Sequence, residues 1–304
     1  MTLPKFIISG FPKCGTTSLH YYLSEHPEIY MAKQKELHFF TNRILSNQNE
    51  GAGDKLAAET HVTSLNQYYR FFVNGKKHKT VGETSPSYIN YPEFFKEIKT
   101  KLSDPKIIVV IRDPIKRAYS NYLHLVREGR EKELFEEALK LEKKRKELKY
   151  SDFWYYKFNS TYYNKINKAI EVFSKVLILT QEELMLSPEK TIKKTYKFLG
   201  VDEGFSPNTL NKKYNPGGTY KDNHTTRIIF KPSKIKNFIK KIVPAYPWMK
   251  DILNKITEKH KIPSEKINES TKKELIRFFK NDVNLIKKLG VDVTRWTNYN
   301  QQLK

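Results

Sequence analysis

Short apolar runs alternate with amphipathic segments along this chain. Four runs predict strands: Lys5–Ser9, Thr80–Gly82, Lys106–Ile111 and Val176–Thr180. The run KIIVVI at 106–111 is continuously apolar, which is typical of a buried parallel strand. Helical periodicity is found between and after the runs, at Thr17–Glu25, Leu65–Phe72, Pro92–Leu102, Phe135–Leu148, Tyr163–Phe173, Pro188–Leu199 and Thr271–Leu289. Strands alternating with helices predict right-handed βαβ units and a parallel sheet covered on both faces.

Turn and cap residues set the boundaries of these elements. Asp113 is a natural N-cap, with Pro114 at the first helical position, and Gly200 follows a helical segment as glycine does at helix ends. The stretch YNPGGTYKD at 214–222 is expected to be a loop. Residues 228–262 are basic and contain three prolines, so we expect broken helix there at best. We therefore expect a single domain over residues 1–304, in which 228–304 form a mostly helical C-terminal part.

Composition indicates what kind of protein this is and which cellular compartment it suits. The chain has 304 residues, and its 38% hydrophobic content is enough for a real core. Cys14 is the single cysteine, which excludes an intrachain disulfide and fits a reducing compartment. No apolar stretch reaches the ~20 residues of a membrane helix, and the first strand begins too early for a signal peptide. We expect a cytoplasmic protein without a membrane span.

The formal net charge of +23 has two interpretations. It fits an anionic ligand or acceptor, but the lysines are spread along the whole chain. Solvated faces therefore explain most of the charge, and an anionic ligand needs only a few of these side chains.

The first strand ends in a glycine loop, the name used here for residues 10–15 (GFPKCG). Its glycines have the spacing of the phosphate-binding motif G-x-x-x-x-G-K-[ST], and the fold expected is that of P-loop-containing nucleotide hydrolase-like proteins. Thr16 replaces the lysine of that motif, and Lys13 lies inside the loop instead. Backbone N–H groups at a helix N-terminus still bind phosphate. The loop therefore indicates a phosphate ligand other than ATP or GTP, although Thr16 and Thr17 also serve as ordinary helix caps.

Two further groups of residues bear chemistry. In IRDPIKRAYSNY at 111–122, Arg112 leaves a buried strand, where its guanidinium can bind phosphate, and Ser120 can donate to the same anion. We interpret Arg117 as a structural ion pair. In KELHFF, Glu36 and His38 are alternative bases for a hydroxyl acceptor, or simply a surface glutamate and a core-edge histidine.

Taken together, PKCGTTSL, KELHFF, GETSPSY and IIVVIRDPIKRAYSNY resemble the sulfotransferase family, in particular its heparan sulfate and bacterial carbohydrate-type branches. The resemblance implies 3′-phosphoadenosine 5′-phosphosulfate (PAPS) as donor, 3′-phosphoadenosine 5′-phosphate (PAP) as product, and no metal. It implies in-line transfer to a hydroxyl or amine, with a saccharide or another small hydroxyl compound as acceptor and no nucleic-acid partner. The implied donor-binding residues are Lys13, Cys14, Gly15, Thr16, Thr17, Ser18, Arg112, Ser120, Gly217, Gly218 and Lys221.

The resemblance also assigns roles in the chemistry. Lys13 would stabilise charge on the departing oxygen, Arg112 and Ser120 would hold the 3′-phosphate, and Glu36 would be the base, with His38 as the substitute. One departure stands out, because Thr84 occupies the place of a lysine near the sulfuryl group in the heparan branch. We expect residues 44–63, 127–159 and 228–264 to form the acceptor pocket, with Trp154, Tyr155 and Tyr156 either stacking on a sugar or packing in the core.

Two rival functions remain open at this stage. A P-loop kinase of a small molecule shares the glycine spacing but needs a magnesium carboxylate, for which Asp113 is the candidate. A non-enzymatic polyanion binder would depend on charge alone and would show a steep salt dependence.

Overall fold

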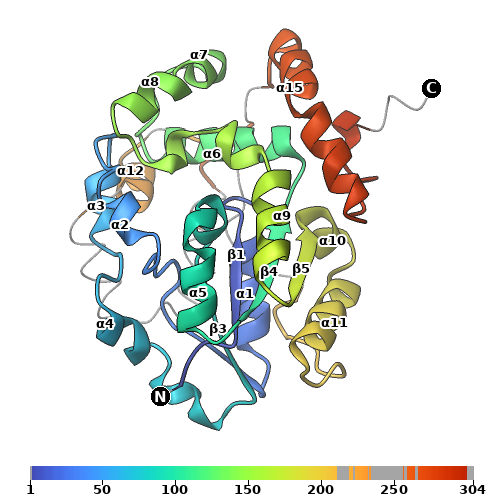
Figure 1. Ribbon diagram of the computed structural model, residues 1–304. Helices are drawn as coiled ribbons and strands as arrows, with labels where there is room; N and C mark the ends of the chain where they lie inside the picture. Colours follow the sequence, from blue (N-terminus) through green and yellow to red (C-terminus); the bar gives the residue numbers. More distant parts are fainter. Residues whose placement is uncertain are drawn as a thin grey trace.

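A five-stranded parallel sheet forms the centre of the molecule (Figure 1). The computed structural model describes residues 2–210, 219–221, 223–231, 233, 256, 259–263 and 266–299. The strands are β1 (Phe6–Gly10), β2 (Ile29–Met31), β3 (Thr80–Thr84), β4 (Lys106–Ile111) and β5 (Val176–Thr180), in the order β2-β3-β1-β4-β5. Because every pairing is parallel, all five carboxyl ends meet at one edge. The expected α/β fold is confirmed.

Helices cover both faces of this sheet. Those flanking it are α1 (Thr16–Ser24), α5 (Phe95–Lys101), α6 (Pro114–Arg127), α9 (Tyr163–Val172), α10 (Gln181–Leu186), α11 (Pro188–Leu199) and α15 (Glu269–Lys288). Peripheral ones are α2 (Asn42–Leu45), α3 (Asp54–Ala58), α4 (Leu65–Arg70), α7 (Phe135–Lys140), α8 (Glu142–Glu147) and α12 (His224–Phe230). In Figure 1, α5 and α9 lie in front of the sheet and α6 crosses above its carboxyl edge. None of the helices in the described ranges is long and apolar enough to cross a membrane.

The structure corrects several expected boundaries. The segment 92–102 is a 3₁₀ turn (Pro92–Phe94) followed by α5, and 135–148 is divided into α7 and α8. Strand β2 was missed because its three residues are too few for a periodic signal. In the glycine-rich stretch expected to be a loop, Thr219–Tyr220 forms β6, which pairs with β7 (Lys261–Ile262). Most of 228–262 lies outside the described residues.

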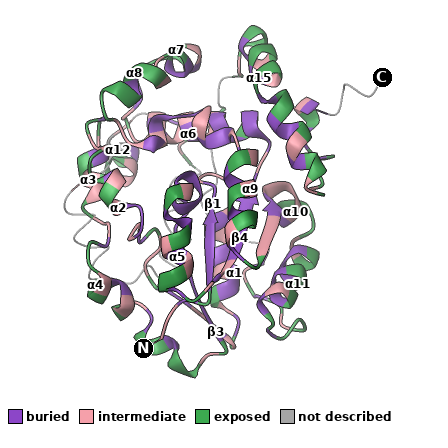
Figure 2. Cartoon of the chain, viewed as in Figure 1, coloured by how far each residue is buried: buried purple, intermediate pink, exposed green. Residues whose placement is uncertain are grey.

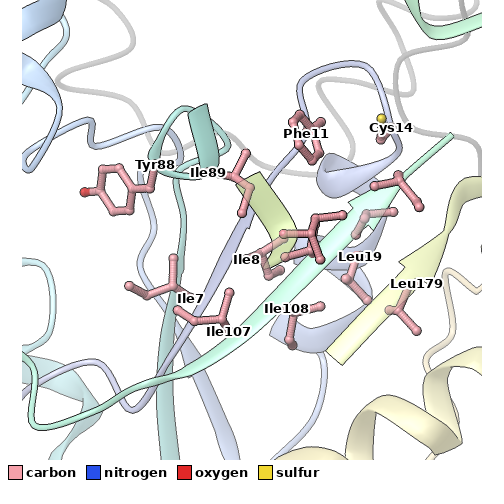
Figure 3. Packing of buried hydrophobic residues seen from close by; sticks show 14 of the residues in the cluster. Ile7, Ile8, Phe11, Cys14, Leu19, Tyr88, Ile89, Ile107, Ile108 and Leu179 are labelled. Carbon is pink, nitrogen blue, oxygen red and sulfur yellow. The ribbon is translucent and has the colours of Figure 1, made fainter. Parts of the chain in front are cut away.

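The core lies between the sheet and its flanking helices. Figure 2 shows the strands as the most buried part of the chain, and Figure 3 shows isoleucines of β1 and β4 packed against Leu19 and Leu179. Gly82 of β3 is in register with Phe6 of β1, and a Cβ at Gly82 would lie 2.2 Å from the Phe6 ring. A side chain at position 82 would therefore overlap the buried ring of Phe6, which explains the glycine.

Local capping sets where the helices begin beyond the sheet edge. Asp113 Oδ1 accepts from the backbone N–H groups of Ile115 and Lys116, as expected of an N-cap. Thr180 and Glu183 form a capping box that starts α10, a helix that periodicity did not reveal. Gly200 has φ 79° and ends α11 in the left-handed conformation, which confirms its expected role.

Candidate active site

Four strand ends bring the predicted residues to one edge of the sheet. Strand β1 leads into the glycine loop, β2 into Lys35 and Glu36, β3 into Ser85, and β4 into Arg112. Backbone contacts join these ends, because Glu36 N donates to Thr84 O at 2.7 Å. An Arg112 Nη atom donates to Lys13 O at 3.5 Å. Ligands of open parallel sheets bind at this edge, so the position fits a candidate active site.

The glycine loop turns directly into α1. Gly15 has φ 92° and is the N-cap of the helix, and within the described structure no side chain caps it. The first N–H groups of α1 therefore point out of the helix end, where an anion is stabilised by both hydrogen bonds and the helix dipole. Lys13 has φ 69°, a conformation uncommon for a residue other than glycine.

Cations gather around Lys13. Burial first, and then the nearby charges of Arg127 and Arg112, lower the pKa of the Lys13 ammonium to about 7, although Glu128 and Glu36 act in the opposite direction. A polyanion stabilises positive charges that lie close together. The arrangement therefore suits a ligand with several negative charges.

Cys14 contributes to the loop in a different way. Its side chain is fully buried, and burial raises the pKa of the thiol to about 12. The Sγ atom lies 3.8 Å from Pro12 O. Because a nucleophilic cysteine needs its thiolate, this side chain has a structural role in the loop, and the backbone N–H of Cys14 donates to Phe11 O at 3.3 Å.

The residues after β4 divide into two roles. Arg112 is half-buried, and its own carbonyl accepts from the Tyr162 hydroxyl at 2.8 Å. Arg117 is fully buried and donates to Pro12 O and Tyr156 O, both at 3.1 Å. The prediction that Arg117 forms an ion pair is therefore wrong. Its partners among the described residues are carbonyl and other neutral oxygens. Ser120 lies half-buried on α6, and its contact with the same anion as Arg112 stays a prediction.

The two candidate bases lie on the loop after β2. Glu36 has φ 58° and a side chain that is 54% exposed, and His38 has φ 54°. The His38 Nδ1 atom lies 2.8 Å from Ser87 Oγ, and burial lowers the pKa of the His38 imidazole. The His38 ring packs against that of His61, with centroids 4.4 Å apart. Glu36 is thus the more accessible of the two bases.

A buried network below this loop supports it. Glu83, at the end of β3, accepts hydrogen bonds from Tyr68 at 2.5 Å and Ser85 at 2.6 Å. Burial raises the pKa of the Glu83 carboxyl to about 7, an effect that these hydrogen bonds oppose. The Ser85 hydroxyl in turn accepts from the backbone of His38 at 3.4 Å. The end of β3 thereby fixes the backbone that presents both candidate bases.

Sequence reasoning missed Lys35. Its Nζ donates to Thr17 Oγ1 at 2.6 Å, and its side chain is 16% exposed. Thr84, which stands where the resembling branch has a lysine, contacts His20 Nδ1 at 2.9 Å through its hydroxyl. The only signal in the sequence was a lysine directly before Glu36 in KELHFF.

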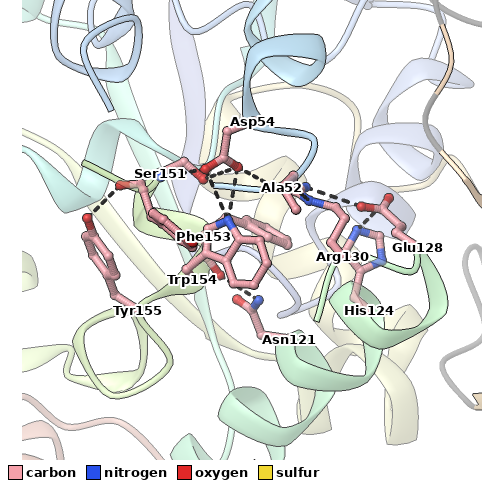
Figure 4. A network of polar contacts seen from close by, with 11 residues as sticks. Ala52, Asp54, Asn121, His124, Glu128, Arg130, Ser151, Phe153, Trp154 and Tyr155 are labelled. Atoms are coloured by element: carbon pink, nitrogen blue, oxygen red, sulfur yellow. Dashed lines mark hydrogen bonds and ion pairs between the residues drawn. The ribbon is translucent and has the colours of Figure 1, made fainter. Parts of the chain in front are cut away.

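Two of the stretches expected around the acceptor pocket are joined by the network in Figure 4. Asp54 on α3 is ion-paired to Arg130 and accepts from Ser151 and from the indole of Trp154. Trp154 and its neighbours Tyr155 and Tyr156 are buried, so these three aromatic residues pack in the core rather than stack on a sugar.

The segment expected to cover the donor is described only in part. Gly217 and Gly218 lie outside the described residues. Lys221 is exposed, and its backbone N–H donates to His260 O at 2.8 Å beside the β6–β7 pair. Next to it, Arg127 lies 4.9 Å from the ring centroid of Phe230 and 6.0 Å from that of Tyr220. The role of Gly217, Gly218 and Lys221 in donor binding stays a prediction.

Comparisons with known proteins agree with this geometry. A family model described as "Sulfotransferase family" matches residues 4–207, which is more than half of the chain. The crystal structure of a sulfotransferase from Alicyclobacillus acidocaldarius superposes with a TM-score of 0.75 at 27% identity, covering 98% of this chain and 100% of that one.

Curated relatives match over shorter ranges. Membrane-associated sulfotransferase kil1 of Dictyostelium discoideum is 34% identical over 122 residues, 40% of this chain and 23% of that protein. Human heparan sulfate glucosamine 3-O-sulfotransferase 5 is 32% identical over 130 residues, 43% of this chain and 33% of that protein. The aligned part of the chain thus spans a third or less of these relatives.

Proposed function

The chain belongs to the sulfotransferase family, and from this premise we propose that it transfers a sulfuryl group from PAPS to a hydroxyl (or amine) of a carbohydrate acceptor. The observation that supports the donor most directly is the set of cations at the glycine loop, where Arg112 and Arg127 lie close enough to Lys13 to lower its pKa. PAPS bears charge at both its 5′-phosphosulfate and its 3′-phosphate. The cluster of Lys13, Arg112 and Arg127 at the glycine loop suits such a ligand.

The proposed reaction is an in-line displacement. Glu36 takes the proton from the acceptor hydroxyl, whose oxygen attacks sulfur and forms the new S–O bond. The S–O bond to the 5′-phosphate breaks, and its electron pair leaves with the phosphate oxygen of PAP. Lys13 and the N–H groups at the start of α1 stabilise the charge on that oxygen, as fixed donors do in comparable transfers.

The carbohydrate acceptor is supported by the kind of groups beside the base. Burial holds the imidazoles of His38 and His61 in their neutral forms, since it lowers both pKa values. Neutral imidazoles are partners for sugar hydroxyls rather than for a charged group. The name of the human relative, a heparan sulfate glucosamine 3-O-sulfotransferase, points to the same acceptor class.

The single cysteine supports a reducing, cytoplasmic setting as part of the proposal.

A kinase is less well supported. The carboxylate it would use for magnesium, Asp113, caps α6 through Oδ1 and accepts from Asn298 through Oδ2 at 2.8 Å. Among the described residues, no three histidine, cysteine or acidic side chains are placed to hold a metal ion. No observation at the site favours binding of MgATP over binding of PAPS.

Ligand-induced thermal stabilisation tests the proposal. PAP at about 100 times its dissociation constant should add roughly 2.7 kcal/mol to the free energy of unfolding, whereas ATP with magnesium should add much less. Stabilisation by ATP with magnesium alone would overturn the proposal in favour of a kinase. Binding that ignores the nucleotide and falls steeply with salt would identify a polyanion binder instead.

A further inference from the structure

Among the described residues, the Lys35 ammonium has one hydroxyl partner and one distant carboxylate partner. It donates to Thr17 Oγ1 at 2.6 Å and lies 3.9 Å from Glu36 Oε1. Among the described residues, Glu36 is the one acid within 4 Å of this nitrogen, and its side chain is 54% exposed. Burial lowers the pKa of the Lys35 ammonium, while Glu36 raises it.

Such a placement is costly for a residue with only a structural task. A largely buried ammonium is stable when charge-assisted hydrogen bonds replace its water shell, and one hydroxyl with an exposed carboxylate 3.9 Å away is a weak replacement. Elsewhere in the fold, buried Arg145 has a full carboxylate partner in Glu131 at 2.7 Å. The ammonium of Lys35 instead points at the second residue of α1, where an anion at the helix N-terminus would lie.

The neighbouring strand β3 brings no charged side chain at Thr84, where it ends. Thr84 ends β3, and its short side chain turns to His20 Nδ1 on α1. The loop after β2 is bonded to the same strand end, because Glu36 N donates to Thr84 O at 2.7 Å. Lys35 therefore approaches Thr17 from the loop after β2, beside the carbonyl of Thr84. The side chain of Thr84 itself carries no charge.

We propose that Lys35 is a catalytic residue that contacts the sulfuryl group during its transfer and supplies, from the β2 loop, a second positive charge beside Thr17. This inference rests on the proposed function. Lys35 exchanges no proton in the step: the acceptor proton goes to Glu36, the new S–O bond forms, and the old one breaks toward PAP. Its charge offsets the negative charge spread over the sulfuryl oxygens while sulfur is bonded to neither oxygen fully.

The experiment compares two nucleotides that differ by the sulfuryl group alone. The dissociation constants of PAPS and PAP are measured for the wild type, for Lys35→Met and for Lys33→Met, an exposed lysine two residues earlier that serves as the matched control. In Lys35→Met, we expect the affinity for PAPS to fall about tenfold or more while the affinity for PAP changes less than twofold. We also expect kcat to fall about a hundredfold, a loss typical of one missing charge-stabilising group. Lys33→Met should match the wild type in all three.

The outcomes separate the inference from the proposed function. Equal losses for PAPS and PAP in Lys35→Met, or no loss for either, would overturn the role of Lys35 while leaving sulfuryl transfer intact. A wild type that binds neither nucleotide overturns the proposed function and the inference with it. If Lys35→Met fails to fold, Lys35→Gln gives the same comparison with a neutral side chain that retains hydrogen bonding.

Discussion

At the residue scale, the two candidate bases share an unusual backbone. Glu36 and His38 both have positive φ without being glycine, a conformation that costs free energy and persists where the surroundings impose it. The surroundings here are the end of β3, through Thr84 O and the Ser85 hydroxyl. The contacts with β3 therefore hold the loop in a strained conformation, which sets the directions of the Glu36 and His38 side chains.

Glu36→Gln tests which of the two is the base. Glutamine keeps the size and polarity of the side chain but cannot take a proton, so turnover should fall at least a hundredfold. The affinity for PAP should stay within about twofold, because the amide changes no donor-binding group. Steady-state kinetics and PAP titration measure the two effects. Undiminished turnover would assign the base role to His38, and His38→Gln would then show the loss.

A pH dependence follows from Lys13. Its pKa is lowered to about 7 in the free protein by burial first and by Arg127 and Arg112 next, and a bound anion favours the charged form. Donor affinity is therefore highest below pH 7 and falls above it, by at most about tenfold per pH unit, which is 1.36 kcal/mol.

Lys13→Arg serves as the comparison, because a guanidinium stays charged throughout this range. The titration of PAP itself is common to both proteins. The ratio of their PAP dissociation constants between pH 6 and 8.5 thus isolates the lysine. A ratio that does not change with pH contradicts a lowered pKa at Lys13.

How much of the site the sequence predicted depends on the residue. The glycine spacing placed Lys13, and the end of a continuous apolar strand placed Arg112, because parallel strands share a carboxyl edge. Lys35 was missed, since its role depends on the short strand β2 and on a contact with Thr17 that no spacing encodes. Arg117 was misjudged because sequence shows a charge but not the carbonyl groups that surround it.

At the scale of elements, α6 stabilises the loop that precedes α1. Arg117 on α6 donates to Pro12 O, to Tyr156 O and to the side chains of Asn121 and Ser160. These bonds join the glycine loop to α6 and to the 3₁₀ turn at Phe158–Ser160.

Boundaries such as the break between α7 and α8 were not predicted, because a charged periodic pattern continues across Leu141.

Arg117→Met should therefore damage both stability and donor binding. Methionine fills much of the volume but leaves several buried acceptors without donors, which costs about 1–3 kcal/mol each. We expect a loss of at least about 3 kcal/mol in urea unfolding and at least a tenfold weaker affinity for PAP. Lys116→Met, at the exposed neighbour, should change neither. An Arg117→Met protein that binds PAP normally would show that the loop holds its shape without α6.

At the scale of the whole molecule, the C-terminal segment is attached to residues that follow β4 and β5 at the carboxyl edge of the sheet. Asp282 on α15 accepts from the backbone N–H groups of Tyr162 and Tyr163, both at 2.9 Å. Beyond α15, the indole of Trp296 donates to Glu182 at 3.1 Å. Glu182 also accepts from the backbone of Asp113. These contacts join α15 and the residues after it to the rest of the described chain, and the single domain over residues 1–304 stays a prediction.

Trp296→Ala tests that single-domain interpretation. The indole is fully buried, and truncating a buried tryptophan costs about 3–5 kcal/mol. In one cooperative domain, that loss lowers the urea midpoint of unfolding by the same amount for two probes. These are far-UV circular dichroism and retention of PAP binding. The exposed neighbour Arg295→Ala should leave both midpoints unchanged. An early transition that melts α15 while the midpoint for PAP binding stays at the wild-type value would show instead that the C-terminal part unfolds independently. The sheet edge with Arg112 would then hold its ligand without the support of Trp296.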